Sequence, residues 1–124
     1  MSSKENVATG QLLALLEARY AIRVLWALRD GHPQTFRLLQ DRVGGITPNT
    51  LNTRLKELRA ANLVTHGSDG YSLTVIGTDL IKRLSDHGAR LTGYPAISIW
   101  HDFKYHPKQL ISGTQDWIYE HLGA

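Results

Sequence analysis

The chain has 124 residues, 42% of them hydrophobic and 20% charged, which is typical of one globular domain with a single core. No apolar run approaches the roughly 20 residues that a membrane-spanning helix needs, and residues 1–10 lack the apolar segment of a signal peptide, so we expect a cytoplasmic protein. The sequence has no cysteine, which excludes disulfide bonds, thiolate zinc sites and thiol redox sensing.

The net charge of +3 is unevenly distributed along the chain. Residues 35–66 contain five basic and two acidic side chains, whereas residues 67–124 contain five basic and six acidic ones. A local excess of positive charge suits a surface that binds phosphates. A bias of this size also arises by chance in a small protein, so the other signals must decide.

The N-terminal part of the chain predicts one long helix or two shorter ones. Residues 1–10 are polar, and we expect them to be disordered. Between residues 11 and 29 apolar side chains recur at helical spacing on more than one face, with a possible break near Arg19 and Tyr20. Such a helix is either deeply buried or shared with a partner chain. The Asp-Gly-His-Pro segment at residues 30–33 ends it.

A short helix is expected next, over residues 36–42. Thr35 can cap it through its hydroxyl, and Gly44 and Gly45 make the turn that follows. The residues expected to face inward are Phe36, Leu38, Leu39 and Val43.

Thr47 and Pro48 predict the start of another helix, which we expect to run to about Ala61. A hydroxyl N-cap precedes a proline at the first helical position, where its missing N–H has no consequence. The spacing i, i+4, i+7 predicts a core-facing set of Leu51, Leu55 and Leu58. The polar outer face comprises Asn49, Thr50, Asn52, Thr53 and Lys56, with Arg54 at its margin.

A β-hairpin and a third amphipathic helix complete the predicted domain. Leu63–His66 and Tyr71–Thr74 alternate like strands and are joined by the loop at residues 67–70. Thr74 is expected to cap a helix over residues 75–91, with Leu80, Ile81, Leu84 and Leu91 on its apolar side. We therefore expect one domain over residues 11–92 and an aromatic, His-rich extension over residues 93–124, which packs on the domain or across a dimer interface.

In this order and spacing, these segments resemble the HxlR-type winged helix-turn-helix transcriptional regulators. The segments that carry the resemblance are Ala18-Arg19-Tyr20, Thr35-Phe36-Arg37-Leu38-Leu39, Gly45-Ile46-Thr47, Arg54-Leu55, Asn62-Leu63-Val64, and Tyr71-Ser72-Leu73-Thr74 with Gly77. The resemblance implies a mainly α fold with a small β-hairpin wing (α+β), with extra N- and C-terminal helices for dimerisation. It also implies a homodimeric regulator, a repressor, bound to a near-palindromic operator.

The chain departs from the family pattern in several places, which include a short wing and a longer tail after Leu91. It lacks the redox-active cysteine that precedes the first helix in many members, so thiol oxidation cannot be its switch. Tyr20 stands where tryptophan is usual. Asn62 replaces a glycine, which fits because asparagine tolerates the left-handed conformation. A small-molecule effector, a partner or constitutive repression remain open as the means of control.

The predicted recognition helix, residues 47–61, offers side chains that can read base edges in the major groove. The amides of Asn49 and Asn52 can pair bidentately with adenine, and threonine can contact bases, phosphates or a thymine methyl group. Arg54 is expected to bind phosphate or to brace the turn; alternatively it pairs with Glu57 or Asp41. The residues expected to contact DNA are Thr35, Arg37, Thr47, Pro48, Asn49, Thr50, Asn52, Thr53, Arg54, Lys56, His66 and Ser68.

The hairpin is a weaker part of this prediction. His66 and Ser68 can approach the sugar edge beside the minor groove, but Asp69 at the tip would repel phosphate. An ordinary surface hairpin is the alternative.

Other site chemistries have little support in the sequence. His101, Asp102 and His106 match no strong metal-ligand spacing, and no catalytic set is apparent, so we expect no metal, no cofactor and no enzyme activity. A speculative effector pocket would be lined by Trp26, Trp100, Phe103 and Tyr105.

The sequence thus favours a regulator that binds specific double-stranded DNA. The alternative is a winged helix module that contacts protein or RNA without sequence-specific DNA binding.

Overall fold

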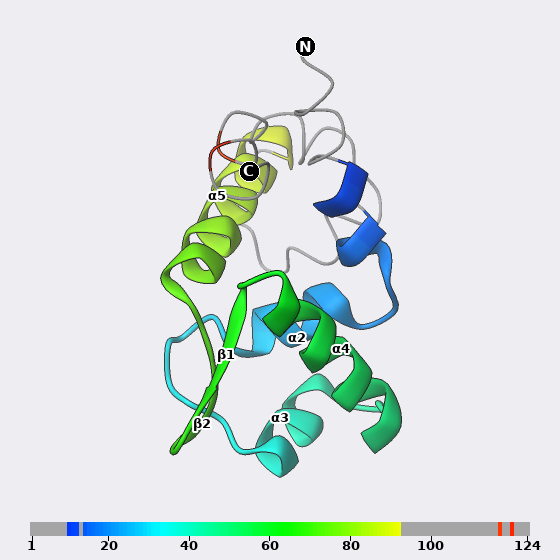
Figure 1. Ribbon diagram of the computed structural model, residues 1–124. Coiled ribbons are helices and arrows are strands. Elements are labelled where there is room, and N and C mark those ends of the chain that lie inside the picture. Colours follow the sequence, from blue (N-terminus) through cyan, green and yellow to red (C-terminus); the bar gives the residue numbers. More distant parts are fainter. Residues whose placement is uncertain (1–9, 13, 93–116, 118–119, 121–124) are drawn as a thin grey trace.

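The computed structural model describes residues 10–12, 14–92, 117 and 120 (Figure 1). Residues 10–12 and 14–17 are helical. The elements that follow are α2 (Ala21–Ala27), α3 (Phe36–Val43), α4 (Pro48–Ala60), β1 (Val64–Gly67), β2 (Gly70–Leu73) and α5 (Val75–Thr92). The mainly helical fold with one antiparallel hairpin is confirmed.

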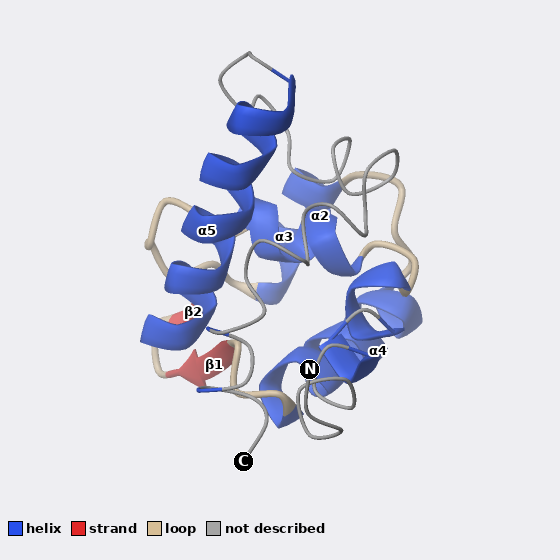
Figure 2. Cartoon of the chain, turned by 90° about the horizontal axis from the view of Figure 1, so that it is seen from above, coloured by secondary structure: helices blue, strands red, loops and turns tan. Residues whose placement is uncertain are grey.

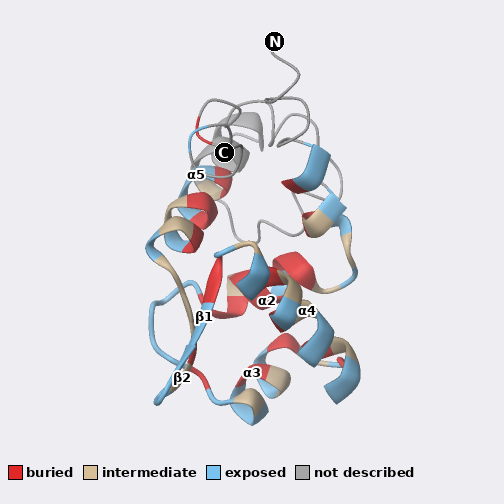
Figure 3. Ribbon diagram, in the orientation of Figure 1, coloured by how far each residue is buried: buried red, intermediate tan, exposed pale blue. Residues whose placement is uncertain are grey.

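The helices and the hairpin enclose one apolar core. α2 contacts α3, α4 and α5, while the hairpin contacts α4 through β1 and α5 through β2. Seen from above, α5 and the hairpin lie on one side of the molecule and α4 on the other (Figure 2). Fully buried leucines come from α2, α3, α4 and α5 and from the segments that follow α2 and α4, namely Leu25, Leu28, Leu39, Leu51, Leu55, Leu58, Leu63, Leu80 and Leu84. The outer side of α4 stays exposed (Figure 3).

The predicted break between the first helical segment and α2 is confirmed. Residues 18–20 form a bend, and Tyr20 has a φ of 72°. Within one chain Leu12 and Leu16 are buried together with the apolar residues of α2, so deep burial explains the broad apolar surface. The helix ends at Ala27, two residues before the predicted end, because residues 28–30 form a turn.

The threonine caps predicted for α3 and α4 are present. Thr35 Oγ1 accepts a hydrogen bond from the Leu38 N–H at 3.2 Å, and Thr47 Oγ1 accepts one from the Thr50 N–H at 3.3 Å. The prediction that Leu38 faces inward is wrong, because its side chain is 53% exposed. Leu39 and Val43, four residues apart, occupy the buried stripe of α3, and Leu38 lies about 100° around the helix from Leu39.

The hairpin is tighter than expected and is tied to the chain before α3. Gly67 pairs with Gly70, so the tip is only Ser68 and Asp69 and not four residues long. Gln34 and Tyr71 exchange two backbone hydrogen bonds of 2.8 Å, which gives β2 a partner on its other edge. A Cβ on Gly70 would lie 2.5 Å from the Gln34 carbonyl oxygen, so this close approach requires glycine.

The junction into α5 uses three residues of the predicted pattern. Asn62 adopts the left-handed conformation with a φ of 61°, as expected. Thr74 caps α5 by accepting a hydrogen bond from the Gly77 N–H at 2.9 Å, and its hydroxyl donates to the Asn62 carbonyl at 2.7 Å. These bonds fix how α5 leaves the hairpin.

Candidate nucleic-acid interface

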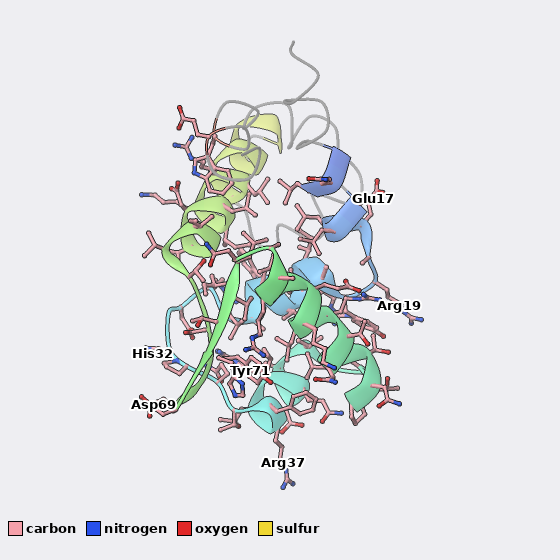
Figure 4. All side chains as sticks on the ribbon, in the orientation of Figure 1. Glu17, Arg19, His32, Arg37, Asp69 and Tyr71 are labelled. Atoms are coloured by element: carbon pink, nitrogen blue, oxygen red, sulfur yellow. The ribbon has the colours of Figure 1, made fainter. Side chains whose placement is uncertain are left out.

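Three elements reach the same end of the molecule: the first turns of α4, helix α3 and the hairpin tip (Figure 1). Arg37 extends away from the body at this end, and Asp69 marks the hairpin tip (Figure 4). Helix α5 and residues 10–12 and 14–17 lie at the opposite end. The fold therefore gathers the start of a helix, a second short helix and a hairpin on one surface.

On the polar face of α4, some side chains form hydrogen bonds within the protein and others do not. Asn49, Asn52 and Lys56 are exposed, and within the described part of the chain none of them has a side-chain partner. Thr53 is exposed, and its hydroxyl donates to the Asn49 carbonyl at 3.0 Å. Thr50 is half-buried, and its Oγ1 accepts a hydrogen bond from the Thr47 hydroxyl at 2.9 Å. The two amides are thus the groups on this face best able to bind a new partner.

Basic side chains flank these amides. Arg37 on α3 is exposed and, among the described residues, has no ion pair. Thr35 is exposed at the start of the same helix, although its hydroxyl oxygen already serves as the cap. Arg37 and Lys56 can therefore meet a phosphate without first breaking an internal contact.

Arg54 is engaged within the protein. Its Nε donates to the Arg19 carbonyl at 2.9 Å, and its Nη1 lies 2.7 Å from both carboxylate oxygens of Glu57. Its side chain is only 19% exposed. Of the roles considered from the sequence, bracing the fold and pairing with Glu57 are the ones seen in the structure.

The hairpin carries an aromatic stack behind its exposed tip. The rings of His66 and Tyr71 lie parallel, with centroids 3.9 Å apart and planes 2° apart. Tyr71 is buried, so it holds the His66 ring against the strand and leaves the ring's outer surface exposed. Ser68 and Asp69 at the tip are exposed.

The speculative effector pocket cannot be assembled from the described residues, because Trp100, Phe103 and Tyr105 lie outside them. Trp26 is half-buried, and the Arg29 guanidinium lies 4.3 Å from its ring centroid. A hollow of about 340 Å³ beside it is lined by Arg23, Trp26, Ala27, Arg29, Arg42 and Val43. This lining contains more arginine than aromatic side chains, unlike the pocket expected from the sequence.

The described residues contain no cluster of three potential metal ligands, and His101, Asp102 and His106 lie outside this part of the chain. The helices in the described ranges are also too short or too polar to cross a membrane.

Several contacts were not anticipated from the sequence. Trp117 is 3% exposed within the core, and its indole N–H donates to the Asp79 carboxylate. Trp117 therefore packs against the core formed by residues 12–84. Tyr20 and Arg23 donate to carbonyl groups of the turn before α4, a role that no motif in the sequence indicates.

A short helix, a glycine turn, a capped second helix and an adjoining hairpin together define a winged helix-turn-helix protein. The chain belongs to the HxlR-like helix-turn-helix family, whose model matches residues 15–94. It is also similar to an uncharacterised HTH-type transcriptional regulator of Halalkalibacterium halodurans, with 32% identity over 60 residues. That alignment covers 48% of this chain and 53% of the relative, so the chain spans about half the relative's length. No solved structure matches the chain.

Proposed function

We propose that the protein is a sequence-specific DNA-binding transcriptional regulator, with α4 as the recognition helix in the major groove. The observation that carries this proposal is the pair of exposed amides, Asn49 and Asn52, on the first turns of α4. Among the described residues they have no partner, and they lie on the same end of the molecule as Arg37 and the hairpin tip. The matched family and the name of the relative support the same class of function.

Each group on this surface has a role that suits its chemistry. The two amides read adenine, and the Thr53 methyl group contacts a thymine methyl. Arg37 and Lys56 neutralise phosphates, while Thr35, Thr47 and Pro48 bring the helix starts close to the backbone. His66 and Ser68 approach the minor-groove edge, and Thr50 keeps the α4 cap in place.

The regulator acts as a homodimer on a near-palindromic operator in the cytoplasm. Two copies place their recognition helices in successive major grooves, about 34 Å apart. Helix α5 and residues 10–12 and 14–17 lie at the end opposite the proposed DNA surface, and the partner copy binds at that end. Repression then follows from occupation of a promoter, under the control of a small effector or of protein concentration.

Fluorescence anisotropy on DNA from upstream of the protein's own gene tests the proposal. Replacing both Asn49 and Asn52 with alanine removes the base-reading amides, and we expect specific affinity to fall by about 10- to 100-fold. Lys82→Ala is the matched control, since Lys82 is exposed on α5 and outside the proposed interface.

Equal binding of the intact protein to operator and shuffled DNA would overturn this function in favour of a protein- or RNA-interaction module. Light scattering measures the assembly separately. A mass near twice 13.9 kDa is expected, and a monomer in the presence of operator DNA would exclude the homodimer.

A further inference from the structure

Three side chains connect residues 19–23, around the start of α2, to the end of α3, to the turn that follows it and to α4. Tyr20 Oη donates to the Gly45 carbonyl at 3.2 Å, and Arg23 Nη2 donates to the Val43 carbonyl at 2.9 Å. In the opposite direction, Arg54 Nε on α4 donates to the Arg19 carbonyl at 2.9 Å. These bonds join segments that are 20 to 35 residues apart in the chain.

The bend before α2 has a backbone conformation that its surroundings must hold. Tyr20 has a φ of 72°, which a bulky residue rarely adopts, and no side-chain cap stabilises the start of α2. Gly44 and Gly45 have φ values of 76° and 69°. The guanidinium carbons of Arg19 and Arg23 lie 4.9 and 5.6 Å from the centroid of the Tyr20 ring, which fixes the ring in place.

The Arg54 side chain is oriented by a second interaction. Glu57, one turn further along α4, lies 2.7 Å from Nη1 and neutralises the guanidinium charge. The Nε–H donates to the Arg19 carbonyl. An arginine held in this way has its charge paired with Glu57 and its Nε and Nη1 already engaged, so it is poorly placed to bind a phosphate bidentately.

We propose that Tyr20, Arg23 and Arg54, hereafter the brace, are positioning residues that set the orientation of α4 relative to α2. The brace thereby determines operator affinity without touching DNA. The inference rests on the proposed function, because it assigns these residues to the same recognition helix. Its physical basis is that base-reading hydrogen bonds need donor–acceptor distances of about 2.7–3.2 Å, so a small rotation of α4 breaks several at once.

The brace also links α4 to the helical segment before the bend. The Arg19 carbonyl that Arg54 holds lies between residues 10–17 and α2. A displacement of that segment therefore changes the anchor of the recognition helix. Apolar packing between α2 and α4 stabilises the fold, whereas the hydrogen bonds of the brace fix the angle between these two helices.

Arg54→Lys and Glu57→Gln distinguish a brace from a phosphate contact. Lysine keeps the positive charge but cannot donate to the Arg19 carbonyl and Glu57 at once. If Arg54 is a brace, both variants weaken operator binding by about 3- to 30-fold and leave the salt dependence of binding unchanged. If Arg54 contacts phosphate, Arg54→Lys keeps its affinity and Glu57→Gln binds more tightly, and either result would overturn the proposal.

Tyr20→Phe supplies an independent arm, since it removes only the hydroxyl that donates to Gly45. We expect Tyr20→Phe to weaken operator binding. Its effect should not add to that of Arg54→Lys in the double variant, because both changes loosen the same connection between α2 and α4. Arg59→Lys is the matched control, as Arg59 is exposed on the same helix and its side chain makes no described contact. Melting curves on every variant distinguish a loss of folding from a change in the orientation of α4.

Amide hydrogen exchange on the DNA-free protein keeps this test independent of the proposed function. Arg54→Lys should speed exchange at the first turns of α4 and at residues 43–45, while Arg59→Lys should not. Unchanged exchange would overturn the brace even if no operator is ever found. Failure of the intact protein to bind operator, with exchange altered as expected, would instead overturn the DNA-binding function.

Discussion

Asn49 and Asn52 differ from the threonines at the start of α4 and from Arg54, because their side chains have no hydrogen-bond partner in the described part of the protein. Thr47 and Thr50 form the helix cap, and Arg54 is engaged in internal contacts, whereas the two amides have no partner among the described residues. Asparagine is a poor helix former, so its presence twice on an exposed helix face has no structural benefit. Specificity is therefore best assigned to these two residues.

The backbone packed against Gly77 leaves no room for a side chain at this position. Alanine usually stabilises a helix relative to glycine by about 1 kcal/mol. Here a Cβ would lie 2.1 Å from the Leu63 carbonyl oxygen, so we expect Gly77→Ala to destabilise the fold by about 1–3 kcal/mol. Thermal unfolding measures this loss. Gly67→Ala, where a Cβ meets nothing within 4 Å, should melt close to the parent protein, and equal melting of both variants would contradict the expectation.

The Asp30–Arg42 pair predicts a small dependence of stability on pH. Slight burial opposes ionisation of Asp30, but the His32 N–H and the Arg42 guanidinium, 3.3 Å away, outweigh it and lower the pKa of this carboxyl. Its stabilisation is therefore present above the ordinary aspartate pKa of about 3.9 and disappears as the pH falls through the lower folded-state pKa.

The exposed pair should contribute no more than about 1 kcal/mol. Urea unfolding should show Asp30→Asn to be slightly less stable than the parent at pH 7. The two proteins should converge as the pH is lowered below about 4. A gap that widens in acid would show the sign to be wrong.

At the scale of elements, the start of each helix-turn-helix helix follows local chemistry. Thr35 and Thr47 cap α3 and α4, and Pro48 occupies the first position of α4. The inward face of α4 follows from the spacing of its leucines, whereas α3 is too short for its periodicity to decide between Leu38 and Leu39. Tertiary packing buries Leu39 and leaves Leu38 exposed.

The α4 cap can be tested directly. Thr47→Ala removes the oxygen that accepts the Thr50 N–H, and we expect the free energy of unfolding to fall by about 1 kcal/mol. Thr47→Ser keeps that oxygen and should retain most of the stability. If serine and alanine have equal effects in denaturant titrations, the cap does not contribute as described.

At the scale of the whole molecule, the hairpin, α3 and α4 form one end, and α5 forms the other. Trp117 joins this second end to the core, although it lies 38 residues after Asp79, its hydrogen-bond partner. The C-terminal extension is therefore part of the folded unit at this position, and the sequence indicated only that aromatic residues there would pack somewhere.

Truncating this residue should reveal its contribution. Trp117→Ala removes a buried indole, and we expect a loss of about 3–5 kcal/mol. Trp117→Phe keeps most of the apolar contact but not the N–H donor, so its loss should be smaller. Chemical denaturation compares the two, and equal stability of Trp117→Ala and the parent would show that the indole does not belong to the core.

The order of helix, helix, hairpin and helix, the threonine caps and the buried leucines of α4 could all be predicted from the sequence. Each depends on residues within one or two turns of each other, where spacing and capping act directly. A bracing role for Arg54 and its pairing with Glu57 were among the alternatives expected from the sequence, but the carbonyl group that it meets could not be predicted. The roles of Tyr20 and Gly77 could not be predicted either, because all these carbonyl groups lie 14 to 35 residues away. Which carbonyl a guanidinium or a hydroxyl meets depends on how packed elements cross, and only the tertiary structure decides that.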